Sequence, residues 1–132
     1  MDIELEELKT NRSSKGYLVE FLTGEDIKIN GGFGHCFFVD FKDKKSVRGN
    51  HYHEHQHEFY TVIEGKAEVT LVDIKSKKRE KIILSDSKFE KLRIGPMVAH
   101  AAVSLAPKTI LLSYYKYAYD PKNPDTKPYK II

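Results

Sequence analysis

Residues 58–73 have the sequence EFYTVIEGKAEVTLVD, and this stretch decides the fold class. Apolar and polar side chains alternate almost strictly over residues 66–73, and residues 59–63 are all aromatic or β-branched. Both features are typical of β-strands, and the Glu64-Gly65 pair between them is a turn signal. The stretch therefore predicts a β-hairpin.

Similar short runs occur on both sides of this hairpin. Further strands are predicted at residues 17–22, 35–41, 46–53, 81–84, 89–94, 99–105 and 109–117. Many short strands at intervals of roughly 8–12 residues favour an all-β sandwich or barrel, and closure of a barrel removes exposed strand edges. The only helix that we expect lies within the first dozen residues.

The end of the chain has a different character. Residues 119–128, YDPKNPDTKP, hold three of the five prolines. Proline lacks a backbone donor, so this segment is neither a central strand nor a helix. We expect an extended arm over residues 119–132 that lies on the domain or on a neighbour. The 132 residues are enough for one domain, 1–132, with a core barrel at about 16–118.

Composition excludes several classes of protein. A net charge of +3, from 22 basic and 19 acidic residues, is too small a bias to indicate nucleic-acid binding. No apolar run approaches the roughly 18–20 residues that span a bilayer, and the acidic start MDIELEELKTNR does not resemble a signal peptide. Cys36 is the single cysteine, which excludes a disulfide within the chain and favours the cytoplasm.

Four of the six histidines lie at alternate positions 51, 53, 55 and 57. Alternate residues of a strand point to the same face, so we expect His51 and His53 to lie side by side and Tyr52 to point away. Glu58 or His57 from the following strand can reach the same space. His55 and His57 are otherwise explained as exposed residues of a turn.

A second signal lies farther along the chain, where the turn at residues 94–98 leads to His100. Imidazoles and a carboxylate on facing strands are the ligands that a borderline divalent metal such as Zn²⁺ prefers. The same groups can instead transfer protons, because histidine titrates near neutrality. Both possibilities stay open for His100, which could equally be a hydrogen-bonded core histidine.

These segments resemble the cupin family. Residues 49–65, GNHYHEHQHEFYTVIEG, resemble its first motif, and residues 95–100, GPMVAH, resemble a degraded second motif. In the second motif Val98 stands where the family usually has glycine, and Ser104 stands in place of its usual asparagine. The resemblance covers residues 46–117 and implies a small antiparallel β-barrel or jelly roll, usually a homodimer.

A finer resemblance concerns enzymes of nucleotide-linked sugars. Residues 48–53, RGNHYH, with Glu58 are similar to the C-terminal cupin domain of bifunctional capsule-sugar epimerase/reductases, as is the tail YDPKNPDT at 119–126. RGNHYH and IGPMVAH also match dTDP-4-keto-6-deoxyhexose 3,4-ketoisomerases. The opening GYLVE at 16–20 resembles those enzymes and the dTDP-4-dehydrorhamnose 3,5-epimerases. The ketoisomerases usually have alanine in place of Tyr52 and Glu-Gln at positions 57 and 58.

The resemblance implies an isomerase of the 3,4-ketoisomerase type, which acts on a nucleotide-linked 4-keto-6-deoxy sugar through an enediol. Such an enzyme would serve deoxysugar biosynthesis for a surface polysaccharide such as capsule or O-antigen. By the same resemblance His51 is the general base and His53 its proton-shuttling or orienting partner. A tyrosine could be the second acid, and Tyr115 is a candidate because it lies on one face of a late strand with Tyr117. Arg48 would bind the diphosphate or the developing oxyanion, because a guanidinium suits phosphate. Further candidate substrate contacts are His35, Tyr60 and Tyr117.

The cofactor and the exact reaction stay open at this point. We expect no cofactor, or alternatively Zn²⁺ or another divalent metal held by His51, His53, Glu58 and His100. Alternative functions are a C3 or C3/C5 epimerase with or without Zn²⁺, a metal-dependent small-molecule cupin, and a non-catalytic sugar-binding module. The expected partners are a nucleotide sugar and a second copy of the chain.

Overall fold

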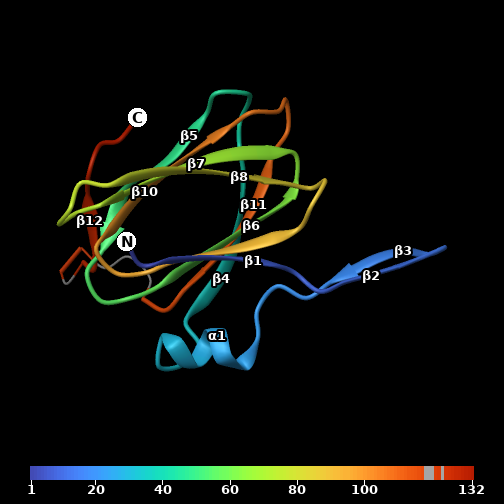
Figure 1. Cartoon of the computed structure of the whole chain (residues 1–132), viewed down its shortest axis with the longest axis horizontal. Coiled ribbons are helices and arrows are strands. Elements are labelled where there is room, and N and C mark those ends of the chain that lie inside the picture. Colours follow the sequence, from blue (N-terminus) through green and yellow to red (C-terminus); the bar gives the residue numbers. More distant parts are fainter. Residues whose placement is uncertain (118–120, 123) are drawn as a thin grey trace.

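The computed structural model describes residues 1–117, 121, 122 and 124–132. Two five-stranded antiparallel sheets enclose one core (Figure 1). The first sheet has the order β1 (Ile3–Glu7), β9 (Glu90–Ile94), β6 (Glu58–Glu64), β11 (Ile110–Tyr115) and β4 (His35–Asp40). The second has the order β12 (Thr126–Pro128), β5 (Val47–His53), β10 (Val98–Ser104), β7 (Lys66–Asp73) and β8 (Arg79–Ser85). This arrangement is the predicted all-β cupin jelly roll.

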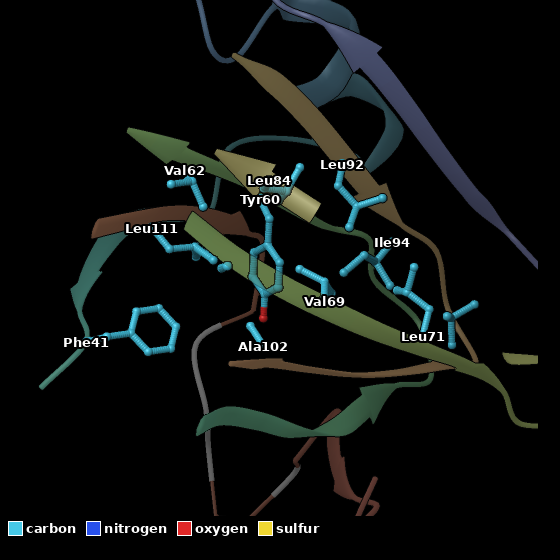
Figure 2. Close-up of a cluster of buried hydrophobic side chains, with 12 residues drawn as sticks. Phe41, Tyr60, Val62, Val69, Leu71, Leu84, Leu92, Ile94, Ala102 and Leu111 are labelled. Carbon is cyan, nitrogen blue, oxygen red and sulfur yellow. The ribbon is translucent and has the colours of Figure 1, made fainter. Parts of the chain in front are cut away.

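The core fills the space between the sheets. Alternate residues of β7 are fully buried and face side chains of the first sheet, as Figure 2 shows for Val69 and Tyr60. The cluster consists of Phe41, Tyr60, Val62, Ala67, Val69, Leu71, Leu84, Leu92, Ile94, Val98, Ala102 and Leu111. Close packing of this kind fixes both sheets relative to each other, and therefore fixes the residues that the sheets bring to the site.

The predicted hairpin at residues 58–73 is wrong, although both of its strands form. β6 pairs with β9 and β11, whereas β7 pairs with β8 and β10. Gly65, at φ +84°, passes the chain from one sheet to the other. Burial explains the outcome, because Val62 on β6 and Val69 on β7 can then share one core from opposite sides.

The start of the chain also differs from the prediction, since residues 3–7 form a strand and not a helix. β1 pairs along its length with β9, and Ile3 packs against the core. The sheet thus includes residues before the predicted start at residue 16. A hairpin of β2 (Thr10–Ser13) and β3 (Gly16–Val19) projects from the barrel in Figure 1. The strand predicted at 17–22 thus ends at Val19, three residues earlier than expected.

One short helix, α1 (Gly24–Ile29), was not predicted. Thr23 and Asp26 form a capping box, in which each side chain accepts a hydrogen bond from the backbone N–H of the other. The buried Asp26 carboxylate also lies 2.6 Å from Nζ of Lys91 on β9, which attaches the helix to the barrel. No helix in the described part of the chain is long and apolar enough to cross a membrane.

Three residues of the predicted C-terminal arm, Tyr119, Asp120 and Asn123, lie outside the described residues. Residues 126–128 form β12 at the edge of the second sheet, where they pair with residues 51–53 of β5. Asn50 holds the last residues, because its Oδ1 accepts the N–H groups of Ile131 at 2.8 Å and Ile132 at 3.1 Å. The final segment therefore lies against the histidine strand.

Candidate active site

A backbone irregularity in β5 sets the direction of the first histidine. The pairing of β5 with β10 shifts register between His100 and Ala101, which is a β-bulge. Gly49 has φ +98°, and a Cβ atom there would lie 2.7 Å from the carbonyl oxygen of His100, so only glycine fits. Beyond the bulge His51 lies opposite His100, with 4.6 Å between their ring centroids.

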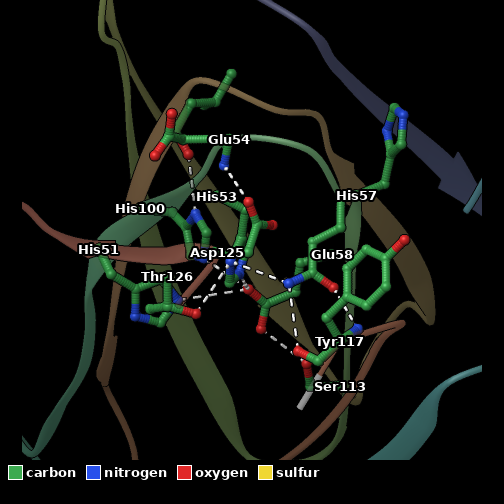
Figure 3. Close-up of polar contacts among 12 residues, drawn as sticks. His51, His53, Glu54, His57, Glu58, His100, Ser113, Tyr117, Asp125 and Thr126 are labelled. Carbon is green, nitrogen blue, oxygen red and sulfur yellow. Dashed lines mark hydrogen bonds and ion pairs between the residues drawn. The ribbon is translucent and has the colours of Figure 1, made fainter. Parts of the chain in front are cut away.

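Three imidazoles converge on one carboxylate oxygen (Figure 3). Oε2 of Glu58 lies 2.8 Å from Nε2 of His100 and 2.9 Å from Nε2 of His53. Nε2 of His51 is 3.5 Å from the same oxygen. The other oxygen, Oε1, accepts the hydroxyl of Ser113 at 2.9 Å. Strands from both sheets therefore build the cluster, since β6 and β11 belong to the first sheet and β5 and β10 to the second.

The cluster keeps Glu58 ionised although the carboxylate is buried. Burial by itself raises the pKa of Glu58. The charge and hydrogen bond of His100, together with the contacts of His51 and His53, lower this pKa by more than burial raises it. As a result, the pKa of Glu58 lies well below its ordinary value. The carboxylate is a permanent negative charge at neutral pH, around which the imidazoles are arranged.

His100 and His53 also have polar contacts at Nδ1, the ring nitrogen that points away from Glu58. Nδ1 of His100 lies 3.0 Å from the carbonyl oxygen of Val98. Nδ1 of His53 lies 3.4 Å from the amide nitrogen of Gln56 and 3.3 Å from the hydroxyl of Thr126. Such outer contacts fix the ring orientation and decide which nitrogen carries the proton.

A cavity of about 160 Å³ opens beside the cluster. His51 and Glu58 line it, whereas His53 and His100 lie behind them and do not. Sites that enclose a whole drug-sized ligand hold roughly 300–1,000 Å³, so this cavity accommodates only part of a nucleotide-linked sugar. Its wall is mainly apolar, with Phe37, Val39, Phe41, Ala102 and Leu111. Its polar side chains are Arg48, His51, Glu58, Tyr60, Ser113 and Tyr115.

The two tyrosines of the cavity stay protonated at neutral pH. Burial, followed by the negative charge of Glu58, raises the pKa of Tyr115. The same two causes, in the same order, raise the pKa of the fully buried Tyr60 well above its ordinary value. Each hydroxyl can therefore donate a hydrogen bond to an oxygen in the cavity.

Not every predicted site residue lies on the cavity wall. His35 packs its ring against Tyr115, with 4.6 Å between centroids, and is not part of the lining. Tyr117 follows the end of β11, is 49% exposed and has Lys116 over its ring. His55 is exposed, and His57 turns away to contact Arg93 at 3.1 Å.

Sequence reasoning missed three residues that contact the cluster, namely Gln56, Ser113 and Thr126. Ser113 carried a usable signal, because it is a polar residue in an apolar strand and shares a face with Tyr115 two positions later. Gln56 and Thr126 carried none, since their contacts depend on where the loop and β12 lie in space.

The donor set fits a divalent metal. One ligand atom from each of His51, His53, Glu58 and His100 lies within 4.8 Å of the others. Nε2 of His51 is buried and has no hydrogen-bond partner among the residues that the structure describes. Three imidazole nitrogens and one carboxylate oxygen are ligands that Zn²⁺ accepts.

The comparisons with known proteins agree with this fold. Residues 11–127 match the family described as the Polysaccharide biosynthesis C-terminal domain. A search of curated proteins finds no match. A similar structure is the dTDP-4-dehydrorhamnose 3,5-epimerase of Bacillus anthracis str. Ames with TDP and PPi bound. It has TM-score 0.82 and 20% identity over 96% of this chain and 78% of that one.

Two ketoisomerases have TM-scores close to that of the epimerase. One is a 3,4-ketoisomerase from Helicobacter canadensis, with TM-score 0.81 and 17% identity over 96% of this chain and 90% of that one. The other is a histidine-to-asparagine mutant of a 3,4-ketoisomerase from Thermoanaerobacterium thermosaccharolyticum in complex with TDP-4-keto-6-deoxyglucose. It has TM-score 0.79 and 22% identity over 96% and 86% of the two chains. At this level of identity the likenesses establish the fold.

The barrel with the cluster on its inner wall belongs to the class of cupin folds. Within that class, the chain belongs to the Polysaccharide biosynthesis C-terminal domain family.

Proposed function

We propose that the chain is an isomerase of a nucleotide-linked 4-keto-6-deoxy sugar, of the 3,4-ketoisomerase type, in deoxysugar biosynthesis. The observation that carries this proposal is the placement of His51 and Tyr115 on one apolar cavity wall. Nε2 of His51 has no hydrogen-bond partner among the described residues, and the hydroxyl of Tyr115 is protonated. The names of the similar structures, which are isomerases and epimerases of dTDP-linked sugars, support the same class of substrate.

The reaction requires a base for the proton on the carbon next to the ketone. Nε2 of His51 accepts this proton, and the resulting negative charge develops on the ketone oxygen. Tyr115 donates a hydrogen bond to that oxygen, which stabilises the enediol. His51 returns its proton to C4, and the proton of the C3 hydroxyl is transferred to the C4 oxygen, so the carbonyl moves from C4 to C3. The apolar wall excludes water from the intermediate.

The remaining residues position these groups. His53 and Glu58 act as positioning residues, because the buried Glu58 carboxylate receives the hydrogen bond of His53 and lies 3.5 Å from His51. Arg48 lines the cavity and is exposed, which suits a guanidinium that binds the diphosphate outside the cavity. Tyr60 contributes a second hydroxyl to the wall, while His35 supports Tyr115 through ring packing.

The test is NMR of a dTDP-linked 4-keto-6-deoxy sugar with the protein in D₂O. A ketoisomerase produces the 3-keto sugar and introduces deuterium at the carbon that receives the proton. A His51→Asn variant must lose this activity, and His55→Asn is the matched control because His55 is exposed. An unchanged sugar signal with the wild-type protein refutes the proposal, and full activity of His51→Asn refutes the role of His51.

A C3 or C3/C5 epimerase that uses a metal is the second candidate, and the four converging donor atoms favour it. A divalent ion such as Zn²⁺ held by His51, His53, Glu58 and His100 would polarise the ketone of the sugar. In this case His51 is a ligand, and Tyr115 remains the acid–base group on the wall. Inductively coupled plasma mass spectrometry of tag-free protein shows whether a metal is bound. In the D₂O experiment, the epimerase introduces deuterium at C3, or at C3 and C5, and the ketone stays at C4.

We also propose that the chain forms a homodimer in the cytoplasm. Support for the dimer comes from the hairpin β2–β3, on which Tyr17 and Leu18 are 56% and 59% exposed. An apolar groove of about 290 Å³ lies beside the hairpin and includes Leu8, Val19 and Phe89 in its lining. Light scattering after size-exclusion chromatography tests the dimer, and a monomeric mass refutes it. A Leu18→Glu variant that remains dimeric shows that the hairpin is not the interface.

A further inference from the structure

The amide of Gln56 has only one orientation that satisfies its neighbours. The side chain is buried, and its Oε1 accepts the backbone N–H of Tyr117 at 2.8 Å. Its Nε2 then lies 3.4 Å from the carbonyl oxygen of Tyr117 and 3.4 Å from Nδ1 of His53. The reverse orientation would set the NH₂ group against the Tyr117 N–H, two donors facing each other. Gln56 therefore presents a donor to His53.

This donor decides the tautomer of His53. An amide NH₂ only donates, so Nδ1 of His53 must accept, and the single proton of the neutral ring lies on Nε2. That proton points to Oε2 of Glu58, which lies 2.9 Å from Nε2 and accepts the hydrogen bond. A ring nitrogen that carries a proton cannot bind a metal, because metal ligands must be deprotonated.

His100 has an acceptor, and not a donor, behind its ring in the same cluster. Its Nδ1 faces the carbonyl oxygen of Val98 at 3.0 Å, and a carbonyl only accepts, so this nitrogen carries a proton. A carbonyl or carboxylate behind a metal-binding histidine is the usual outer contact of metal sites. His53 has the donor Gln56 in this place, together with the hydroxyl of Thr126 at 3.3 Å, which can either donate or accept.

We propose that Gln56 is a positioning residue that holds His53 in the tautomer protonated on Nε2 and thereby weakens metal binding by the cluster. This inference rests on the proposed function in one respect, since a cluster with low metal affinity leaves His51 free as a base. Metal binding by Nε2 of His53 requires the ring proton to move from Nε2 to Nδ1, and the net charge of the ring does not change. The hydroxyl of Thr126 then accepts the hydrogen bond of Nδ1–H. The strength of the metal site is thus set by residues that touch neither metal nor substrate.

The first test uses the unaltered protein. Long-range ¹H–¹⁵N NMR distinguishes the two tautomers of a neutral histidine, and a His53→Gln variant assigns the signal of His53. We expect metal-free protein to show the proton of His53 on Nε2. A proton on Nδ1 overturns the proposal, and this result does not depend on the folding of any variant at position 56.

The second test is the affinity for Zn²⁺, measured by competition with a chromogenic chelator. In Gln56→Glu the carboxylate still accepts the hydrogen bond of the Tyr117 N–H, and its second oxygen now accepts a hydrogen bond from Nδ1–H of His53. We expect the tautomer to change and Zn²⁺ to bind about 10–100-fold more tightly, the range known for outer-shell changes. Unchanged affinity in a folded variant overturns the proposal.

Thr126 supplies an independent variant. Thr126→Val removes the hydroxyl that must accept the Nδ1 proton when His53 binds the metal, so Zn²⁺ should bind about 10-fold more weakly. Thr126→Ser retains the hydroxyl and should restore the affinity, and equal affinity of Val and Ser variants contradicts the argument. None of these measurements uses turnover. A chain inactive on keto sugars would therefore refute the proposed function and leave the tautomer assignment standing.

Discussion

Glu58→Gln tests whether the buried carboxylate organises the cluster. Glutamine has nearly the same shape, so the substitution removes charge without opening a cavity. The carboxylate lies 2.8 Å and 2.9 Å from nitrogens of His100 and His53 and accepts the Ser113 hydroxyl at 2.9 Å. An amide cannot satisfy all three, because one of its two polar atoms only donates.

The expected cost follows from this geometry. Removal of one partner from a buried ion pair destabilises a protein by about 3–5 kcal/mol. We expect about 3 kcal/mol at pH 7, the lower end of that range, because the amide oxygen still accepts part of the hydrogen bonds that the carboxylate accepts. With a urea dependence of about 1.5 kcal/mol per molar for a domain of this size, the unfolding midpoint falls by about 2 M.

Urea unfolding followed by circular dichroism measures the shift. Glu68→Gln is the matched control, since Glu68 makes an ion pair of 3.2 Å with the well-exposed Lys81 and the same substitution removes only a surface pair. Such pairs contribute about 0–1 kcal/mol. Equal midpoints for the two variants would refute the organising role of Glu58.

The pH dependence of the stability difference between wild type and Glu58→Gln tests the direction of the pKa shift of Glu58. The pKa of Glu58 is lowered in the folded protein, so its stabilising contribution is fully present above the ordinary carboxyl range of about 4.3. The contribution is lost only as the pH falls through the lower folded value. The gap between wild type and Glu58→Gln should therefore persist from pH 7 to about pH 5 and close in stronger acid. A gap that closes above pH 5 would show that the pKa is not lowered.

Three further substitutions test the site. His51→Asn should lower kcat at least about 100-fold on the keto sugar. The thermal midpoint should stay nearly unchanged, because Nε2 of His51 has no hydrogen-bond partner among the described residues. A kcat equal to that of His55→Asn speaks against the assigned base. Tyr115→Phe should reduce kcat by about 10-fold or more with little change in KM, and an unaffected kcat excludes this hydroxyl as the donor. Gly49→Ala should destabilise the protein by at least about 1–3 kcal/mol in urea unfolding, since φ is +98° and the new Cβ would clash with the His100 carbonyl oxygen. An unfolding midpoint equal to that of the wild type would contradict the bulge geometry.

The sequence predicted most of the strands and the central part of the site because both depend on local patterns. Alternation of side chains located β5 and placed His51 and His53 on one face, and their rings are 5.0 Å apart. The same rule applied to IELEE would have indicated β1, where Ile3 packs inward while Glu4 and Glu6 line an outer pocket with Lys91. The predicted helix was therefore an avoidable error.

The remaining features depend on contacts between distant segments. The pattern of residues 58–73 indicates two strands but not their partners, and the partners are decided by which apolar faces can share a core. Likewise, nothing in the sequence near Thr126 indicates that β12 pairs with β5 and brings its hydroxyl to His53. Long-range pairing of this kind is invisible to local periodicity.

The geometry of the cluster makes its two possible kinds of chemistry exclusive. His51 is the only imidazole of the four-residue cluster on the cavity wall in the described part of the chain, and its Nε2 faces the same carboxylate oxygen as the other two imidazoles. That nitrogen can bind a metal or accept a proton from a sugar, but it has one lone pair and cannot do both. In the proposed reaction, the outer contacts of the buried His53 and His100 therefore act without approaching the substrate, because they decide how strongly a metal competes with the sugar for His51.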